Sequence, residues 1–129
     1  MTEITHVVLG PLETNCYFLR DTETGDVLVV DPGWYDPLLE REVRRVGAEN
    51  VKGILLTHCH FDHMMGLDGF LKEYDVPVYV EEEDEEVLQD PRLNLSATYT
   101  EGYVFTKAET VRDGEILSFA GYEFRVIHT

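Results

Sequence analysis

The segment LLTHCHFDHMMG, residues 55–66, places three histidines and one aspartate within six positions. It continues the apolar run that begins at Val51, and residues 51–57 read as a strand buried on both faces. After the polar cluster, apolar side chains recur at helical spacing, at Met64, Leu67, Leu71 and Tyr74. This spacing predicts an amphipathic helix over residues 63–74. The cluster is therefore expected where a buried strand passes into a helix.

The four polar residues of this cluster have the chemistry of metal ligands. On extended backbone, residues two apart point the same way, so His58 and His60 can converge on one ion. Asp62 and His63 follow where the chain bends into the helix, and we expect them to project toward a neighbouring point. Imidazole and carboxylate are ligands that zinc, iron and manganese accept. Two such ions close together can share a water and lower its pKa, which generates a hydroxide nucleophile.

The alternative interpretation is a helix start that collects polar residues without binding an ion. A single histidine would fit that interpretation, whereas four ligand-type residues in the order His-x-His-x-Asp-His favour a metal site. Cys59 lies between two of the ligands and points away from them on extended backbone, so it is expected to pack rather than to bind metal. His6 is expected to be structural or solvent-facing, and Cys16 to be buried.

The rest of the chain predicts a single α/β domain, a mixed sheet with flanking helices. Alternating or apolar runs predict strands over residues 3–10, 15–21, 26–33 and 76–80, and a β-hairpin over 115–127 that turns at Ala120–Gly121. A helix is expected over 36–47, with Asp36 as its cap, Pro37 in its first position and Gly47 as its stop. The acidic run in residues 81–90 predicts a short, solvated helix.

Composition limits the classes of partner. The chain has 26 acidic and 10 basic side chains, a formal net charge of −16, which would repel a phosphate backbone, so nucleic acid is not expected as a partner. No apolar stretch reaches the about 18 residues that a membrane helix requires, and residues 1–15 lack the pattern of a secretory signal. Only two cysteines occur. We therefore expect a cytoplasmic protein with no membrane partner.

The segment THCHFDHMMG resembles the Thr-His-x-His-x-Asp-His signature of the metallo-β-lactamase-fold hydrolases. Further blocks are similar, in order, to the glyoxalase-II-like (hydroxyacylglutathione hydrolase-like) branch of that superfamily: GPLETNCYFLRD, VLVVDPG, VPVYV, LQDPRLNLSA and DGEILSFAGYEFRVIHT. The resemblance implies an αββα sandwich that carries a dinuclear centre, usually of zinc, with iron or manganese as alternatives. It also implies a metal-bridging hydroxide that attacks a small thioester or related acyl substrate.

The resemblance assigns roles to individual residues. It implies that His58 and His60 bind the first ion, while Asp62 and His63 bind the second. Asp62 is in addition the expected catalytic residue. Asp31, in the Asp-Pro-Gly turn, corresponds to an acid that supports the metal loop from behind, as carboxylates around metal sites commonly do.

The family pattern continues beyond the last residues, EFRVIHT, with Pro-Gly-His-Thr and later blocks that complete both ligand sets. His128 matches the residue before that turn and is not a ligand. We therefore expect residues 1–129 to form one metallo-β-lactamase-like domain that lacks its C-terminal half, with two protein ligands for each ion. This leaves a rival interpretation open: a non-catalytic half-domain, a metal-binding or interaction module that pairs with itself or with a complementing chain. A nuclease within the same superfamily is disfavoured by the charge of −16.

Overall fold

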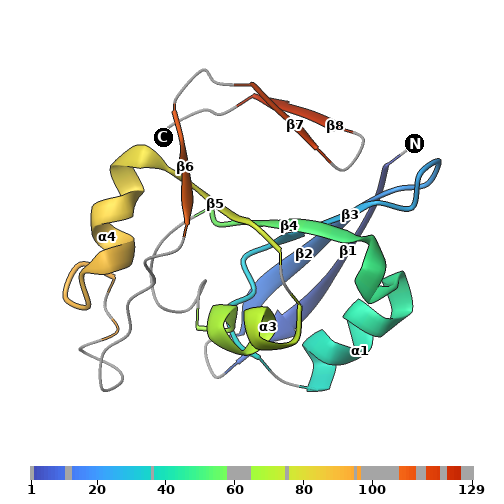
Figure 1. The fold of residues 1–129 in the computed structure, drawn as a ribbon. Helices are drawn as coiled ribbons and strands as arrows, with labels where there is room; N and C mark the ends of the chain where they lie inside the picture. Colours follow the sequence, from blue (N-terminus) through green and yellow to red (C-terminus); the bar gives the residue numbers. More distant parts are fainter. Residues whose placement is uncertain are drawn as a thin grey trace.

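A six-stranded mixed sheet forms the centre of the molecule (Figure 1). This computed structural model describes residues 2–10, 13–35, 37–57, 65–74, 76–94, 96, 108–112, 116–119 and 122–125. The strands of the sheet are β1 (Thr2–Leu9), β2 (Thr14–Asp21), β3 (Val27–Val30), β4 (Val51–Leu55), β5 (Val78–Glu81) and β6 (Glu109–Val111). A separate hairpin consists of β7 (Ile116–Phe119) and β8 (Tyr122–Arg125). The α-helices are α1 (Pro37–Val46), α3 (Leu67–Glu73) and α4 (Glu85–Gln89), and the 3-10 helices are η1 (Ala48–Asn50) and η2 (Glu82–Asp84).

The strands lie in the order β1-β2-β3-β4-β5-β6. β2 pairs antiparallel with β1 and with β3, whereas β3, β4, β5 and β6 pair in parallel. The four parallel strands therefore end at one place, which we call the carboxyl end of the sheet. β1 also ends there, because two antiparallel pairings give it the direction of β3. In open sheets with parallel strands, ligands bind beyond the carboxyl ends of the strands.

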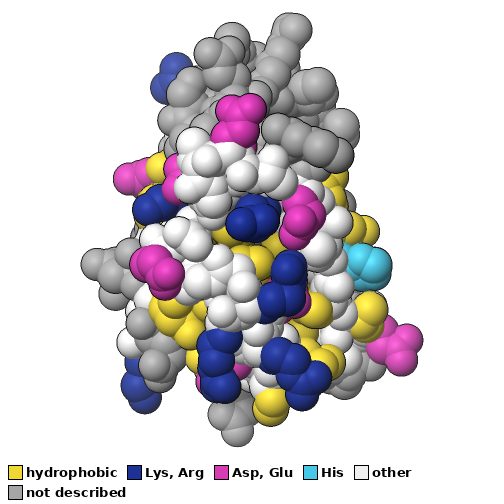
Figure 2. Space-filling model, turned by 90° about the vertical axis from the view of Figure 1, so that its right-hand side faces the viewer, with side chains coloured by type: hydrophobic (Ala, Val, Ile, Leu, Met, Phe, Trp, Pro, Cys, Tyr) yellow, Lys and Arg dark blue, Asp and Glu magenta, His cyan; other side chains and the backbone are white. Residues whose placement is uncertain are grey.

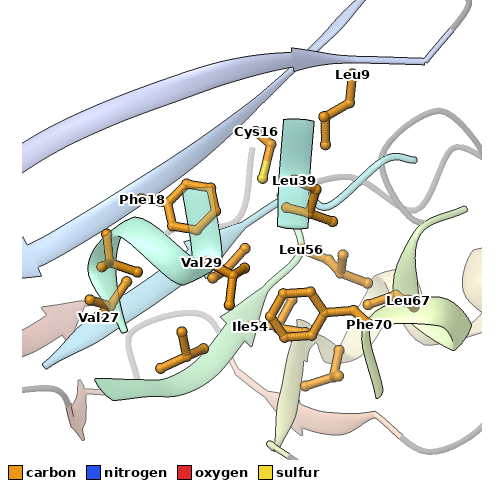
Figure 3. Packing of buried hydrophobic residues seen from close by; sticks show 14 of the residues in the cluster. Leu9, Cys16, Phe18, Val27, Val29, Leu39, Ile54, Leu56, Leu67 and Phe70 are labelled. Atoms are coloured by element: carbon orange, nitrogen blue, oxygen red, sulfur yellow. The ribbon is translucent and has the colours of Figure 1, made fainter. Parts of the chain in front are cut away.

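Helices α1 and α3 pack against one face of the sheet, and the β7–β8 hairpin lies on the other side in Figure 1. The core between the sheet and these helices consists of fully buried side chains from β1, β2, β3, β4, α1 and α3 (Figure 3), among them Leu9, Cys16, Phe18, Val29, Ile54, Leu39, Leu67 and Phe70. Leu88 joins α4 to the same cluster. Apolar burial of this extent is the main favourable term in folding, and here it places both helices against the sheet.

Most of the predicted elements are confirmed, including the mixed sheet, the flanking helices and the start of α1 at Pro37. The helix predicted over 63–74 is wrong at Met65 and Gly66, which form a turn, so that α3 begins at Leu67. The backbone N–H of Gly66 donates to the carbonyl oxygen of Pro32, a residue far away in sequence, at 2.9 Å. Strand β6 was not predicted, whereas both strands of the hairpin were.

Single residues also follow the predictions. Cys16 is fully buried, and His6 is exposed on β1 with its ring centroid 5.8 Å from that of Tyr17. Gly47 ends α1 with a φ of +91°, in the left-handed region. Asp36, Cys59 and the Ala120–Gly121 turn lie outside the described residues. None of the described helices combines the length and the apolar character needed to cross a membrane.

A polar contact joins α1 to the first strand. The Thr5 hydroxyl donates to Glu42 at 3.1 Å, and the Arg45 guanidinium donates to the same carboxylate oxygen at 2.8 and 2.6 Å. The hydrogen bond from Arg45 lowers the pKa of Glu42, and the hydrogen bond from Thr5 acts in the same direction against the opposing effect of burial. Glu42 is largely buried, since its side chain is only 14% exposed. The ionised form of Glu42 therefore stabilises the folded state.

Replacement of Glu42 by Gln is expected to lower the free energy of unfolding at neutral pH by about 1 kcal/mol, because the amide cannot form the charged pair with Arg45. The difference between parent and variant should be present above the ordinary pKa of 4.5 and should disappear as the pH falls through the lowered value, because the unfolded state then binds more protons. Urea unfolding of both proteins over a series of pH values measures this difference in the free energy of unfolding. Glu86→Gln, which removes an exposed acid of α4, should keep the parent's pH dependence. An unchanged profile in Glu42→Gln would contradict the assignment.

Candidate functional site

The four predicted metal ligands, His58, His60, Asp62 and His63, lie outside the described residues. Both ends of their segment are described, at Thr57 and at Met65. Within the described ranges, no group of three His, Cys, Asp or Glu side chains is suited to hold an ion. The candidate site is therefore built from the residues that hold the two ends of segment 58–64.

One turn, residues 31–35, contacts both ends of this segment, and we call it the Asp31 turn. Asp31 follows β3 directly at the carboxyl end of the sheet, and its φ of +57° lies in the left-handed region. That region is uncommon for a residue with a side chain, and Asp tolerates it better than most. The conformation is held by the Asp31 N–H, which donates to the Leu55 carbonyl at 3.0 Å, and by the Gly33 N–H, which donates to the Asp31 carbonyl at 2.8 Å.

The Asp31 carboxylate holds the first end of the segment. Its Oδ1 accepts the backbone N–H of Thr57 at 2.8 Å, and its Oδ2 accepts the Thr57 hydroxyl. Asp31 is 4% exposed, so these bonds form where water competes little for them. Thr57 comes directly before His58. The carboxylate therefore fixes the position of the backbone immediately before the predicted ligand segment.

Gly66 holds the second end of the segment against the same turn. Its N–H donates to the Pro32 carbonyl at 2.9 Å. A Cβ atom at Gly66 would lie 2.4 Å from that oxygen and 2.9 Å from the carbonyl carbon of Trp34, closer than real Cβ atoms come. One turn further along α3, a Cβ at Gly69 would lie 2.7 Å from the Tyr35 ring. Two glycines thus let α3 begin in direct contact with the Asp31 turn.

The Asp31 turn therefore connects to the chain immediately before and shortly after the predicted ligands. Its far side is anchored as well, because the Tyr35 hydroxyl donates to Glu40 of α1 at 2.9 Å. The residues on both sides of the predicted ligands are thus held by the same turn. The donor set of three imidazoles and a carboxylate fits zinc or iron. The four ligands themselves stay a prediction.

The neighbouring strand ends add polar groups to this end of the sheet. The Leu56 N–H donates to the Tyr79 carbonyl at 3.1 Å, which continues the pairing of β4 and β5 toward Thr57. Burial and the nearby Glu109 raise the pKa of Tyr79, so its hydroxyl remains neutral. At the end of β6, Arg112 forms an ion pair with Glu82 at 3.1 Å.

Sequence reasoning identified Asp31 through the family resemblance, and the structure places its carboxylate on the residue before the cluster. Its action on a metal stays a prediction. Sequence reasoning missed the contact of Gly66 with Pro32 and that of Gly69 with Tyr35. The available signal was the pair of glycines three residues apart in a segment otherwise suited to a helix, where each glycine lowers helix stability.

Over most of its length, this chain is similar to known proteins. Residues 9–129 match the family model of the metallo-β-lactamase superfamily. An uncharacterized protein of Aquifex aeolicus (strain VF5) is 30% identical over 125 residues, which cover 95% of this chain and 57% of that relative. The hydroxyacylglutathione hydrolase of Hahella chejuensis is 39% identical over 82 residues, which cover 61% of this chain and 29% of that enzyme.

Solved structures give the same result for the fold. The crystal structure of the B3 metallo-β-lactamase BLEG-1 superposes with a TM-score of 0.83 at 30% identity, and the match covers 98% of this chain and 61% of that one. TTHA1623, solved in a di-iron-bound form, superposes with a TM-score of 0.75 at 26% identity, and the match covers 96% and 60%.

This chain thus spans about three-fifths of the length of the Aquifex relative and of these two structures. The family model covers nearly the whole chain, and the mixed sheet with its flanking helices follows the fold of these structures. The predicted metallo-β-lactamase fold is confirmed, and the chain belongs to the metallo-β-lactamase superfamily.

Proposed function

We propose that this protein is a metal-dependent hydrolase that cleaves a thioester or a related acyl substrate. The observation that carries the proposal is the Asp31 turn, which holds both ends of the segment THCHFDHMMG at the carboxyl end of the sheet. Membership of a superfamily of metallo-hydrolases supports the reaction class. The acyl substrate is supported by the partial similarity to the hydroxyacylglutathione hydrolase of Hahella chejuensis.

The roles of the residues follow from their chemistry. His58 and His60 would hold one ion, and Asp62 and His63 would hold a second. Asp62 is also the proposed catalytic residue. Bound zinc would supply a Lewis acid that polarises the acyl carbonyl and activates water. Asp31 would be a positioning residue that acts on the ligands through Thr57, whose N–H it accepts. We propose zinc as the metal, with iron and manganese as the alternatives that the same donor set accepts.

Segment 58–63 offers two protein ligands for each of two ions, whereas catalytic zinc normally has three. The proposal therefore includes further ligands from outside this segment, supplied by more of the same domain, by a second copy of the chain or by a complementing chain. Sedimentation of the metal-loaded protein distinguishes a monomer from a site assembled from two chains.

We also propose that the protein is cytoplasmic.

Substitution of His58 or Asp62 by Ala is expected to remove most of the bound metal, because each leaves one ion with a single ligand from the segment. The measurement is metal analysis of purified protein by plasma mass spectrometry. His6→Ala serves as the matched control, since His6 is exposed on β1, and it should keep the metal content of the parent. Equal zinc or iron in all four proteins would remove the basis of the proposal.

Substitution of Asp31 by Asn is expected to weaken zinc binding about 10- to 100-fold, because the amide cannot accept both donors of Thr57 and the entry of the ligand segment shifts. Competition with a chelator of known affinity measures the change. Asp21→Asn provides a control: Asp21 is also a buried acid that accepts a backbone N–H in a turn, at the opposite end of β3. If both variants lose zinc affinity equally, the effect is one of general stability.

Hydrolysis of a thioester at a defined metal loading tests catalysis directly. We expect turnover that His60→Ala reduces by at least about 100-fold, as for loss of a metal ligand. The rival interpretation, a metal-binding module without activity, would show metal binding in the parent and the same background rate in parent and variant.

A further inference from the structure

Trp34, the single tryptophan of the chain, lies on the Asp31 turn with 37% of its surface exposed. A large aromatic side chain gains more from burial than almost any other residue, so partial exposure on a rigid turn is a feature to explain. The neighbouring Tyr35 places its ring on Gly69 instead. Of these two aromatic residues, Tyr35 therefore packs against α3, whereas Trp34 stays partly exposed.

The position of Trp34 is fixed from two sides. A Cβ atom at Gly66 would meet its backbone nitrogen and carbonyl carbon at 3.1 and 2.9 Å. On the other side, a Cβ at Gly10 would lie 3.0 Å from the Trp34 Cβ and 3.2 Å from its Cγ. Gly10 directly follows β1 and has a φ of +73°, so the close approach coincides with a backbone conformation that favours glycine. The side chain of Trp34 therefore packs against the end of β1, while its backbone contacts Gly66, just before α3.

This location is beside the proposed hydrolytic site. Gly66, which contacts the backbone of Trp34, follows His63 by three residues, and Asp31 on the same turn binds the residue before His58. Trp34 thus lies on the turn that contacts the chain before and after the predicted ligands. A side chain packed against its own protein loses less conformational entropy when it binds a ligand than a free one does.

The charges described around the sheet disfavour an anionic ligand at its carboxyl end. Glu13, Asp31 and Glu81 lie at the carboxyl end of the sheet, where Arg112 is already paired with Glu82. A group of four cations lies at the opposite end, in the last turn of α1, at the end of β2 and at the start of β4: Arg44, Arg45, Arg20 and Lys52. Figure 2 shows Lys and Arg side chains gathered on the side of the molecule that carries α1.

We propose that the exposed face of Trp34 binds the apolar acyl group of an uncharged thioester and so selects substrates by the length of that group. The inference rests on the proposed function for the reaction, but it concerns a surface that exists without the metal. Trp34 is a specificity-determining residue in this account, and the ions and their ligands carry out the chemistry.

The test uses two uncharged thioesters, S-hexanoyl-N-acetylcysteamine and S-acetyl-N-acetylcysteamine, which differ by four methylene groups. Their binding to the metal-free chain, where turnover does not interfere, is measured by equilibrium dialysis. We expect the hexanoyl probe to bind about tenfold tighter, less than full burial of four methylenes would give, because the ring covers only one side of the acyl chain. The hexanoyl probe should also shift the fluorescence of the single tryptophan, and the acetyl probe should not.

Variants separate the ring from other apolar surface. Trp34→Ala should reduce the tenfold preference to less than about twofold, and Trp34→Phe should keep an intermediate value, because it retains a smaller ring. Ile4→Ala removes a more exposed apolar side chain, at 63%, near the far end of β1, and should keep the full preference. Urea unfolding of each variant verifies that it is folded.

The inference is overturned if the parent binds both probes equally, if its fluorescence does not respond to the hexanoyl probe, or if folded Trp34→Ala keeps the preference. Zinc content and thioester turnover, measured on the same preparations, test the proposed function separately. A Trp34-dependent preference in a chain that binds no metal would refute the hydrolase and support the binding surface. Thioester turnover without a Trp34-dependent preference would support the hydrolase and refute the binding surface.

Discussion

The pairing of the Asp31 carboxylate with Thr57 is the contact on which the rest of the site depends. It joins the end of β3 to the end of β4, because one buried carboxylate accepts two hydrogen bonds from Thr57. Strand pairing alone aligns these two strands only as far as Val30 and Leu55. Beyond that point, Leu56 pairs with Tyr79 of β5, on the other side of β4. Asp31 extends the alignment by two residues, up to the first predicted ligand, at the cost of a left-handed backbone.

Three glycines let the Asp31 turn pack closely against its neighbours, because each lacks a side chain at a point where two parts of the chain meet. Gly10 makes room for Trp34, Gly66 for the backbone of the Asp31 turn, and Gly69 for Tyr35. The turn is thereby packed among the end of β1, the end of β4 and the start of α3. Function at such a place follows a general pattern, in which a rigid arrangement of strands and helices presents a short functional segment.

Charge and apolar surface are distributed to suit this arrangement. The chain carries a formal charge of −16, yet several of its few cations pair with acids along α1 and the adjoining strands. The carboxyl end of the sheet keeps acids and one partly exposed tryptophan. Divalent cations are attracted to a surface of this kind, whereas nucleic acid is repelled. This distribution of charge supports the proposal of a metal-dependent hydrolase.

The amino-acid sequence by itself determined most of the strands and helices and pointed to the segment from His58 to His63 as a metal site, which stays a prediction, because apolar periodicity and ligand-type residues are local patterns. It also led to the superfamily. It misplaced the start of α3 and missed β6, whose three residues carry little periodicity. Only the tertiary structure decided that Pro32, Trp34 and Tyr35 meet Gly66, Gly10 and Gly69. These contacts join residues that are far apart in the chain, and the steric need for glycine arises only once the partner backbone is in place.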